Sequence, residues 1–177
     1  MMDNGLIINY DLGDKRFIHF LIPPNHSGIG IFREEKDKLL ELAKNLGVNL
    51  SVKPFRGVLL KSGEVLVFKW FINHNNCPFL KNNECLIYLD RPLICRSFPL
   101  LPPFSCQPVP DKPVVSKYCT NSCVCDELLK DYNRLINKQN EMMEKINELI
   151  KKDLVSFERT SRVIRIMNDE KSVVEEL

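Results

Sequence analysis

The chain has 177 residues, with 25 basic and 23 acidic side chains and a formal net charge of +2. This length suits one domain with its own core, since domains commonly run about 100 to 200 residues. The balanced charge gives no argument for nucleic acid or an anionic membrane as a partner. The sequence has no run of about 18 apolar residues and no signal-peptide pattern at its start, so we expect a cytoplasmic protein without a membrane segment.

Two short runs rich in β-branched and aromatic residues open the chain, at residues 6–10 and 16–22. They predict two paired strands joined by a turn, and the two prolines that follow end the second strand. His19 falls in the second run and His26 in the loop after it. We interpret both as histidines without a ligand role.

The middle of the chain predicts a short helix and then a β-hairpin. Residues 33–46 carry apolar side chains at helical spacing, with acidic residues in the first turn and Gly47 at the C-cap. Residues 57–60 and 64–72 flank a Lys-Ser-Gly turn, which is a hairpin signal.

A proline-rich loop and a long helix follow. Six of the eleven prolines lie between Phe98 and Pro113, so this segment is neither a helix nor a central strand. Residues 126–152 have an apolar stripe that predicts a helix of about seven turns with Asp126 as its N-cap. We expect a second helix over residues 154–167. The stripe of the long helix either packs on its own domain or forms half of a coiled-coil dimer.

The cysteines are the strongest functional signal. The first 76 residues have none, and all seven lie at Cys77, Cys85, Cys95, Cys106, Cys119, Cys123 and Cys125. In the cytosol such a cluster is more often metal-binding or catalytic than a disulfide framework. The chain lacks the Cys-x2-Cys pairs typical of structural zinc, so the spacing favours an iron–sulfur centre, with zinc as the alternative. His74 is either a further ligand or a polar loop residue.

Three interpretations without metal stay open at this point. The cysteines are buried small apolar residues, as free cysteine often is. They form disulfides, as in the cytosol of some thermophiles. Or they include a redox-sensing thiol pair in which Arg96 lowers the pKa of Cys95.

The segment 77–99 also resembles a known family. It contains Cys-Pro-Phe-Leu at 77–80, Cys-Leu-Ile-Tyr at 85–88, Arg-Pro at 91–92 and Cys-Arg-Ser-Phe-Pro at 95–99. In this order the four motifs resemble the core signature of the YkgJ-like cysteine-cluster family, a zinc- or iron-chelating domain. Members typically open with a dense cysteine group, whereas residues 17–31 here have histidines but no cysteine. The chain therefore keeps either a single four-thiolate centre or only the fold.

The resemblance implies a set of site residues. The expected metal ligands are Cys77, Cys85, Cys95 and Cys119, the last because it precedes the long helix. Cys106 replaces Cys119 if the ligand loop is short, and Cys123 and Cys125 are further alternates. We interpret Arg91 and Arg96 as cofactor-binding residues that donate to cluster sulfides or to carbonyls of the ligand loops.

Together these observations predict an α+β fold, a small mixed domain with β-hairpins, one short helix, a cysteine-rich loop region and a long C-terminal helix. Residues 1–125 form the metal-binding domain, and residues 126–177 form a helical extension that packs on it or makes a homodimer. We expect a 4Fe–4S cluster, or zinc, in a structural or electron-transfer role with an unknown protein or redox partner.

Two alternatives stay open beside this expectation. Bacterial flagellin lysine methylases carry a similar cysteine motif, so the resemblance also allows an iron–sulfur-dependent protein-modifying enzyme. The other alternative is a disulfide-stabilised or dimerising interaction protein without metal.

Overall fold

The computed structural model describes residues 6–11, 17–22, 28–73, 77–102, 113–116, 125–156 and 173–174. Their fold is α+β, as the sequence predicts. In chain order the elements are β1 (Leu6–Asp11), β2 (Phe17–Ile22), β3 (Gly28–Phe32), α1 (Arg33–Leu46), β4 (Val52–Leu59), β5 (Val65–Asn73), β6 (Leu80–Lys81), β7 (Glu84–Cys85), the 3-10 turn η1 (Tyr88–Asp90), α2 (Leu93–Arg96), β8 (Leu100–Leu101), β9 (Val114–Val115), α3 (Asp126–Lys151) and β10 (Val173–Val174).

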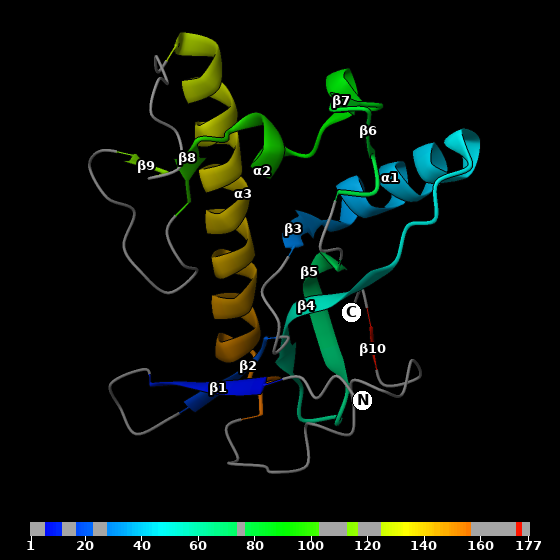
Figure 1. Cartoon of the computed structure of the whole chain (residues 1–177). Helices are drawn as coiled ribbons and strands as arrows, with labels where there is room; N and C mark the ends of the chain where they lie inside the picture. Colours follow the sequence, from blue (N-terminus) through cyan, green and yellow to red (C-terminus); the bar gives the residue numbers. More distant parts are fainter. Residues whose placement is uncertain are drawn as a thin grey trace.

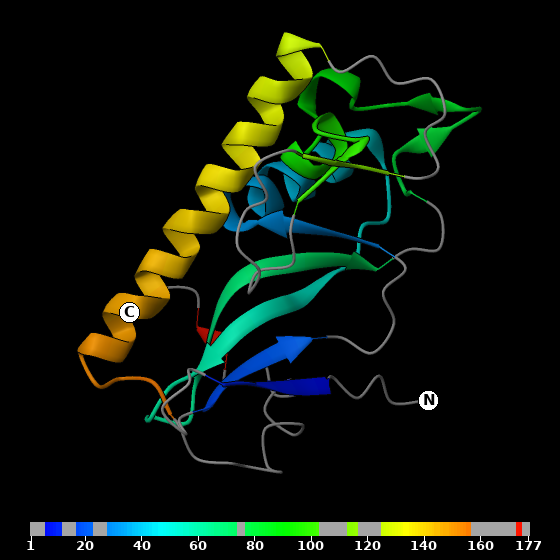
Figure 2. The ribbon, with the colours of Figure 1, turned by 90° about the vertical axis from the view of Figure 1, so that its left-hand side faces the viewer.

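One six-stranded sheet organises the molecule. Its strands follow the order β1-β2-β4-β5-β10, and β3 pairs with β5 beside this path. All neighbours are antiparallel except β10, which runs parallel to β5. Figure 2 shows strands β3, β5, β4, β2 and β1 one below another beside α3. The predicted pairing of the first two strands is confirmed, with Leu6 opposite Ile22.

The central hairpin of β4 and β5 is longer than the sequence predicts. It turns at Gly63, whose φ of 89° suits a glycine. Strand β4 begins at Val52 instead of residue 57, because register shifts on either side of Arg56 let the pairing continue past Pro54. Strand β3 was not predicted, and it pairs along β5 with Ile31 opposite Trp70.

The sheet has an apolar cluster on each face. On one face α1 contributes Leu39 and Ala43 to a core with β3, β5 and the loop residues Phe79 and Ile87. On the other face α3 packs on β4 and β5, and this second cluster contains Val58, Leu60, Leu66, Met142, Ile146, Leu149 and Val155. Neighbouring residues Val58 and Leu59 belong to different clusters, as the twofold alternation of a strand requires.

Helix α1 has the predicted bounds, and its two ends explain them. At its start the Phe32 amide donates to Glu35 Oε2 at 2.9 Å, which satisfies one of the amides that a helix leaves without an internal partner. At its end Gly47 adopts the left-handed conformation, with φ of 65°, and its amide bonds back into the last turn.

Helix α3 is the predicted long helix, with two corrections at its ends. It begins at Asp126, so the N-cap is Cys125 and not Asp126. It ends at Lys151, and the second helix predicted from residue 154 does not start there. Asp153 takes a positive φ of 57°, and Val155 instead forms an antiparallel bridge with Leu60 and is fully buried. Residues 157–167 of that predicted helix lie outside the described residues.

The apolar stripe of α3 is covered by its own chain: its second half packs on the central sheet, and its first half packs on Leu100 through Tyr132 and Ile136. Leu135, Met142 and Ile146 are each at most 5% exposed. This is the packing expected of an intramolecular helix, and a homodimer through α3 stays a prediction.

Among the described helices, none combines the length and the apolar character needed to cross a bilayer.

Candidate metal centre

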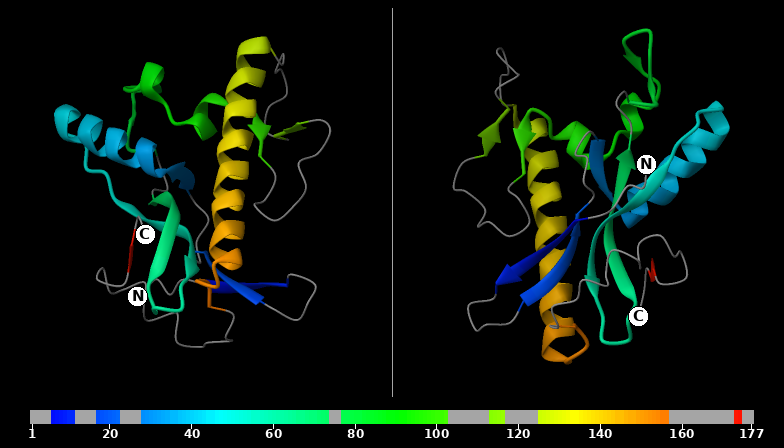
Figure 3. Two further views of the ribbon diagram at one scale, coloured as in Figure 1. Left: turned by 180° about the vertical axis from the view of Figure 1, so that it is seen from behind. Right: turned by 60° about the horizontal axis from the view of Figure 1, so that its bottom comes forward.

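Three cysteines line one cavity of about 170 Å³. They are Cys77, Cys85 and Cys95, the three cysteines of the motifs in segment 77–99. The cavity lies between the segment that follows β5 and the α1 face of the sheet. Its apolar walls come from β3, α1, β5 and the loop, through Ile29, Leu39, Ile72, Phe79 and Ile87. The loop segment that carries the cysteines spans from α1 to α3 in Figures 1 and 3.

Tight turns bring the first two cysteines together. The Leu80 amide donates to the Cys77 carbonyl at 3.0 Å, and Leu80 then pairs with Cys85 across the β6–β7 hairpin. Asn82 and Asn83 form its turn with φ of 51° and 64°, values that asparagine tolerates better than most residues. Phe79, which lies between the two cysteines in the sequence, is 2% exposed and anchors the hairpin in the core.

The third cysteine lies on the short helix α2. The amide of Cys95 donates to the Pro92 carbonyl at 2.9 Å, which forms the single turn of this helix. Proline at its N-cap fixes the backbone before the turn begins. Cys77 is exposed, whereas Cys85 and Cys95 are half-buried, so the cavity reaches the surface on the Cys77 side.

The electrostatics of the cavity suit a cation. The pKa of the Cys95 thiol is raised to about 11, chiefly by burial and then by the neighbouring thiols of Cys77 and Cys85, while the Arg91 guanidinium opposes the rise. The thiols are therefore close enough to repel one another as thiolates, and a bound metal removes that repulsion. The redox-sensor interpretation required a lowered pKa at Cys95 and is wrong on this point.

The two arginines of the signature have different surroundings. Arg91 lines the cavity, its Nε donates to the Tyr88 carbonyl at 2.9 Å, and its guanidinium lies 3.8 Å from the centre of the Tyr88 ring. Arg96 is not among the residues that line the cavity. It binds Asp131 on α3, and this hydrogen bond lowers the pKa of Asp131 below its ordinary value.

None of the other proposed ligands is found at the cavity within the described residues. His74, Cys106, Cys119 and Cys123 lie outside the described residues. Cys125 is an exposed free thiol at the start of α3 and does not line the cavity. Cys77, Cys85 and Cys95 are free thiols as well, so no disulfide joins these four. Within the described ranges, no group of three or more His, Cys, Asp or Glu residues has the geometry of a metal-ion site.

Residues 33–126 match the family model CxxCxxCC, described as a "putative zinc- or iron-chelating domain". The chain belongs to this family. The CxxCxxCC match spans α1, the central hairpin, all seven cysteines and the first residue of α3, so the resemblance seen in segment 77–99 is confirmed. Membership supports chelation of zinc or iron as the function, without choosing between the two metals. Searches among curated proteins and solved structures found no significant match.

The CxxCxxCC match begins after the region in which the resemblance places the N-terminal cysteine group. The matched range starts at residue 33, and the chain has no cysteine before Cys77. The thiolates that this sequence offers to a metal all lie within residues 77–125.

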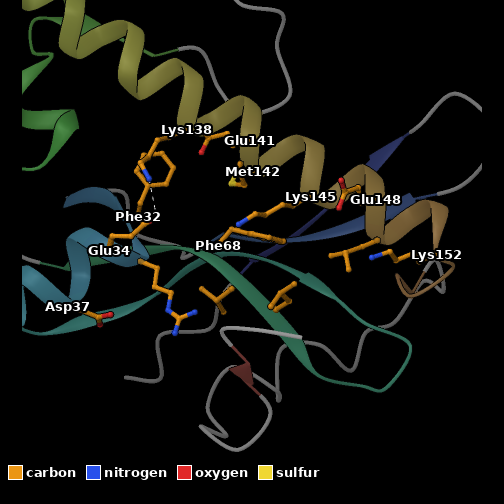
Figure 4. A pocket seen from close by; sticks show the side chains of 14 residues that line it. Phe32, Glu34, Asp37, Phe68, Lys138, Glu141, Met142, Lys145, Glu148 and Lys152 are labelled. Carbon is orange, nitrogen blue, oxygen red and sulfur yellow. Dashed lines mark hydrogen bonds and ion pairs between the residues drawn. The ribbon is translucent and has the colours of Figure 1, made fainter.

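A second, larger cavity of about 640 Å³ lies between α3, the first turn of α1 and strand β5. Figure 4 shows Lys138 and Glu141 of α3 near Glu34 of α1 at one end of this groove, and Glu148 and Lys152 at the other end. Lys138 Nζ lies 3.1 Å from Glu34 Oε1 and closes one end. Acidic and basic side chains line the groove in equal number, with four of each, so its charge selects neither an anion nor a cation.

Proposed function

We propose that this chain holds one cysteine-ligated metal centre, and that the centre is an iron–sulfur cluster. Cys77, Cys85 and Cys95 supply three thiolates, and the fourth comes from Cys119, with Cys106 as the alternative. The observation that carries the proposal is the shared cavity: three thiols from separate turns of the chain line the same 170 Å³. Thiolates are the ligands that iron–sulfur clusters and zinc both use.

The size of the cavity favours a cluster over a single ion. A zinc ion sits about 2.3 Å from each of its sulfurs, so its ligands close around it and leave no space between them. A cavity of about 150 Å³ accommodates a molecule as large as benzene. The cavity that the three cysteines line, together with eight other residues, is of this order. It therefore fits a group of several atoms better than one ion.

The surroundings suit an electron-transfer or structural role. When bound, an iron–sulfur cluster supplies one-electron transfer at a potential set by charge, hydrogen bonds and exposure. Here Phe79 and Ile87 exclude water from the inner side of the cavity, and Arg91 places a positive charge near the thiolates. The exposed Cys77 side offers the short approach that a redox partner needs.

Metal analysis of anaerobically purified protein tests this proposal. We expect about four iron and four acid-labile sulfide per chain, with a brown colour and broad visible absorption, as thiolate-ligated clusters show. Colourless protein with about one zinc per chain would overturn the proposal of an iron–sulfur cluster, whereas the proposal of a thiolate metal site would stand. Protein that contains neither metal after reconstitution with iron and sulfide would overturn the proposal as a whole.

A further inference from the structure

We propose that Asp131 on α3 is a positioning residue for the metal centre, because it holds the ligand helix α2 through Arg96 and so fixes the direction of the Cys95 thiol. This inference rests on the proposed function. It also gives α3 a second role, in addition to its packing on the sheet through its apolar stripe.

Helix α2 cannot hold its own position. It has four residues, Leu93–Arg96, and one turn of hydrogen bonds from Cys95, Arg96 and Ser97 back to Pro92 and Leu93. An isolated helix this short is far below the length that is stable in water. The place of α2, and of the thiol it carries, therefore depends on contacts with other elements.

The first end of α2 is attached to α1. The Leu93 amide donates to Glu35 Oε1 at 2.7 Å. The other oxygen of the same carboxylate accepts the Phe32 amide at the start of α1. Glu35 thus serves the first turns of two helices at once, and it fixes where α2 begins.

The second end of α2 is attached to α3. Arg96 Nε donates to Asp131 Oδ2 at 3.0 Å, and its Nη2 donates to Oδ1, which makes the pair bidentate. The Asp131 side chain is 13% exposed and the Arg96 side chain 30% exposed, so solvent screens this pair less than a surface pair. Arg134 adds a weaker contact to Oδ1 at 3.4 Å.

Cys95 lies between these two attachments and next to Arg96. Without the Arg96–Asp131 pair, Glu35 would still fix α2 at its first residue, and Leu100 would anchor the chain on α3 four residues beyond Arg96. The turn that carries the thiol would lie between these two points and would be less firmly held. Residues that orient a metal ligand without touching the metal typically change affinity by about 10- to 100-fold when removed. Asp131 is expected to act in this range even though every thiol remains in place.

A double-mutant cycle with Zn²⁺ alone as the probe, competed against a chromogenic chelator, tests the inference. Asp131→Asn and Arg96→Gln should each weaken binding about 10- to 100-fold. The double variant should be no weaker than the Arg96→Gln single variant, because Asp131 acts only through Arg96. Glu34→Gln is the matched control: it breaks the ion pair of Glu34 with Lys138, which joins α1 to α3 without involving α2, and should leave affinity unchanged. Equal affinity of Asp131→Asn and wild type would overturn the inference.

Alkylation of the metal-free protein separates this inference from the proposed function. We expect Cys95 in Asp131→Asn to react with iodoacetamide at least about threefold faster than in wild type, measured on its peptide by mass spectrometry, because α2 opens more often. The rate at Cys125 should not change. If wild type binds no metal but Cys95 becomes more reactive in the variant, α2 is held by Asp131 and the proposed function alone is wrong. An unchanged rate at Cys95 would contradict the positioning role.

Discussion

Replacing Cys95 by serine is expected to lower the metal content of purified protein to less than about a tenth of the wild-type value, and to weaken Zn²⁺ binding at least about 100-fold. Four-coordinate structural zinc sites in zinc-finger peptides bind with roughly 10–16 kcal/mol, so each ligand accounts for about 3 kcal/mol, or about two orders of magnitude in affinity. Serine keeps the size of the side chain but does not ionise at neutral pH. Elemental analysis and chelator competition measure the two quantities.

Cys125→Ser is the matched control for this variant. Cys125 is also a described free thiol, but it is exposed and does not line the cavity. The control should bind as much metal as wild type. If Cys95→Ser and Cys125→Ser lose metal equally, or if neither loses any, the cavity is not the metal site. Single substitutions of Cys106 and Cys119 then identify the fourth ligand, because only one of them should behave like Cys95→Ser.

Replacing Lys69 by methionine is expected to stabilise the protein at pH 7 by roughly 1–4 kcal/mol, because removing a buried charge often has this effect. Lys69 lies in the middle of β5 and is 5% exposed. Its pKa is lowered to about 7, chiefly by burial and then by the charge of Arg56, while Glu35 opposes the shift. The Phe32 ring, 4.6 Å from Nζ, compensates part of the lost hydration. Chemical denaturation gives the difference in unfolding free energy.

The lowered pKa of Lys69 also determines how the unfolding free energy of the wild type changes with pH. Below pH 7 both the folded and the unfolded chain carry the proton, so burial of the charge costs stability. Between pH 7 and the pKa of about 10.4 of an unfolded lysine, only the unfolded chain binds the proton, and the unfolding free energy rises with pH.

Lys69→Met should remove this rise, so that the advantage over wild type shrinks towards pH 10. Lys44→Met, at an exposed position of α1, should change stability by less than about 0.5 kcal/mol at any pH. A wild-type unfolding free energy that falls between pH 7 and 9 relative to Lys69→Met would contradict the account.

The sequence predicts those elements whose signals are local. Gly47 and Gly63 mark the end of α1 and the turn of the central hairpin, and both adopt the positive φ that glycine favours. The cysteine motifs predict that Cys77, Cys85 and Cys95 belong to one site, and the structure places them on one cavity. Strand β3 has no such signal, since two of its five residues are glycine, and it is a strand because β5 offers an edge to pair with.

Contacts between distant residues could not be predicted. Glu35 and Leu93 are 58 positions apart, and Arg96 and Asp131 are 35 apart. In the sequence Glu35 is one of several acidic residues in a first turn, and Asp131 is one polar residue among many on a long helix. The fold alone brings them to the two ends of α2. Lys69 is similar, because its burial follows from the pairing of Phe32 and Arg56 on either side of it.

X-ray absorption at the metal edge of the loaded protein tests the central claim most directly, because it reports which atoms contact the metal. Thiolates from the Cys77, Cys85 and Cys95 cavity predict a first shell made of sulfur, with a second shell of iron for a cluster and none for zinc, whose sulfurs lie at about 2.3 Å. A first shell dominated by nitrogen and oxygen would show that the metal binds elsewhere and would contradict the account.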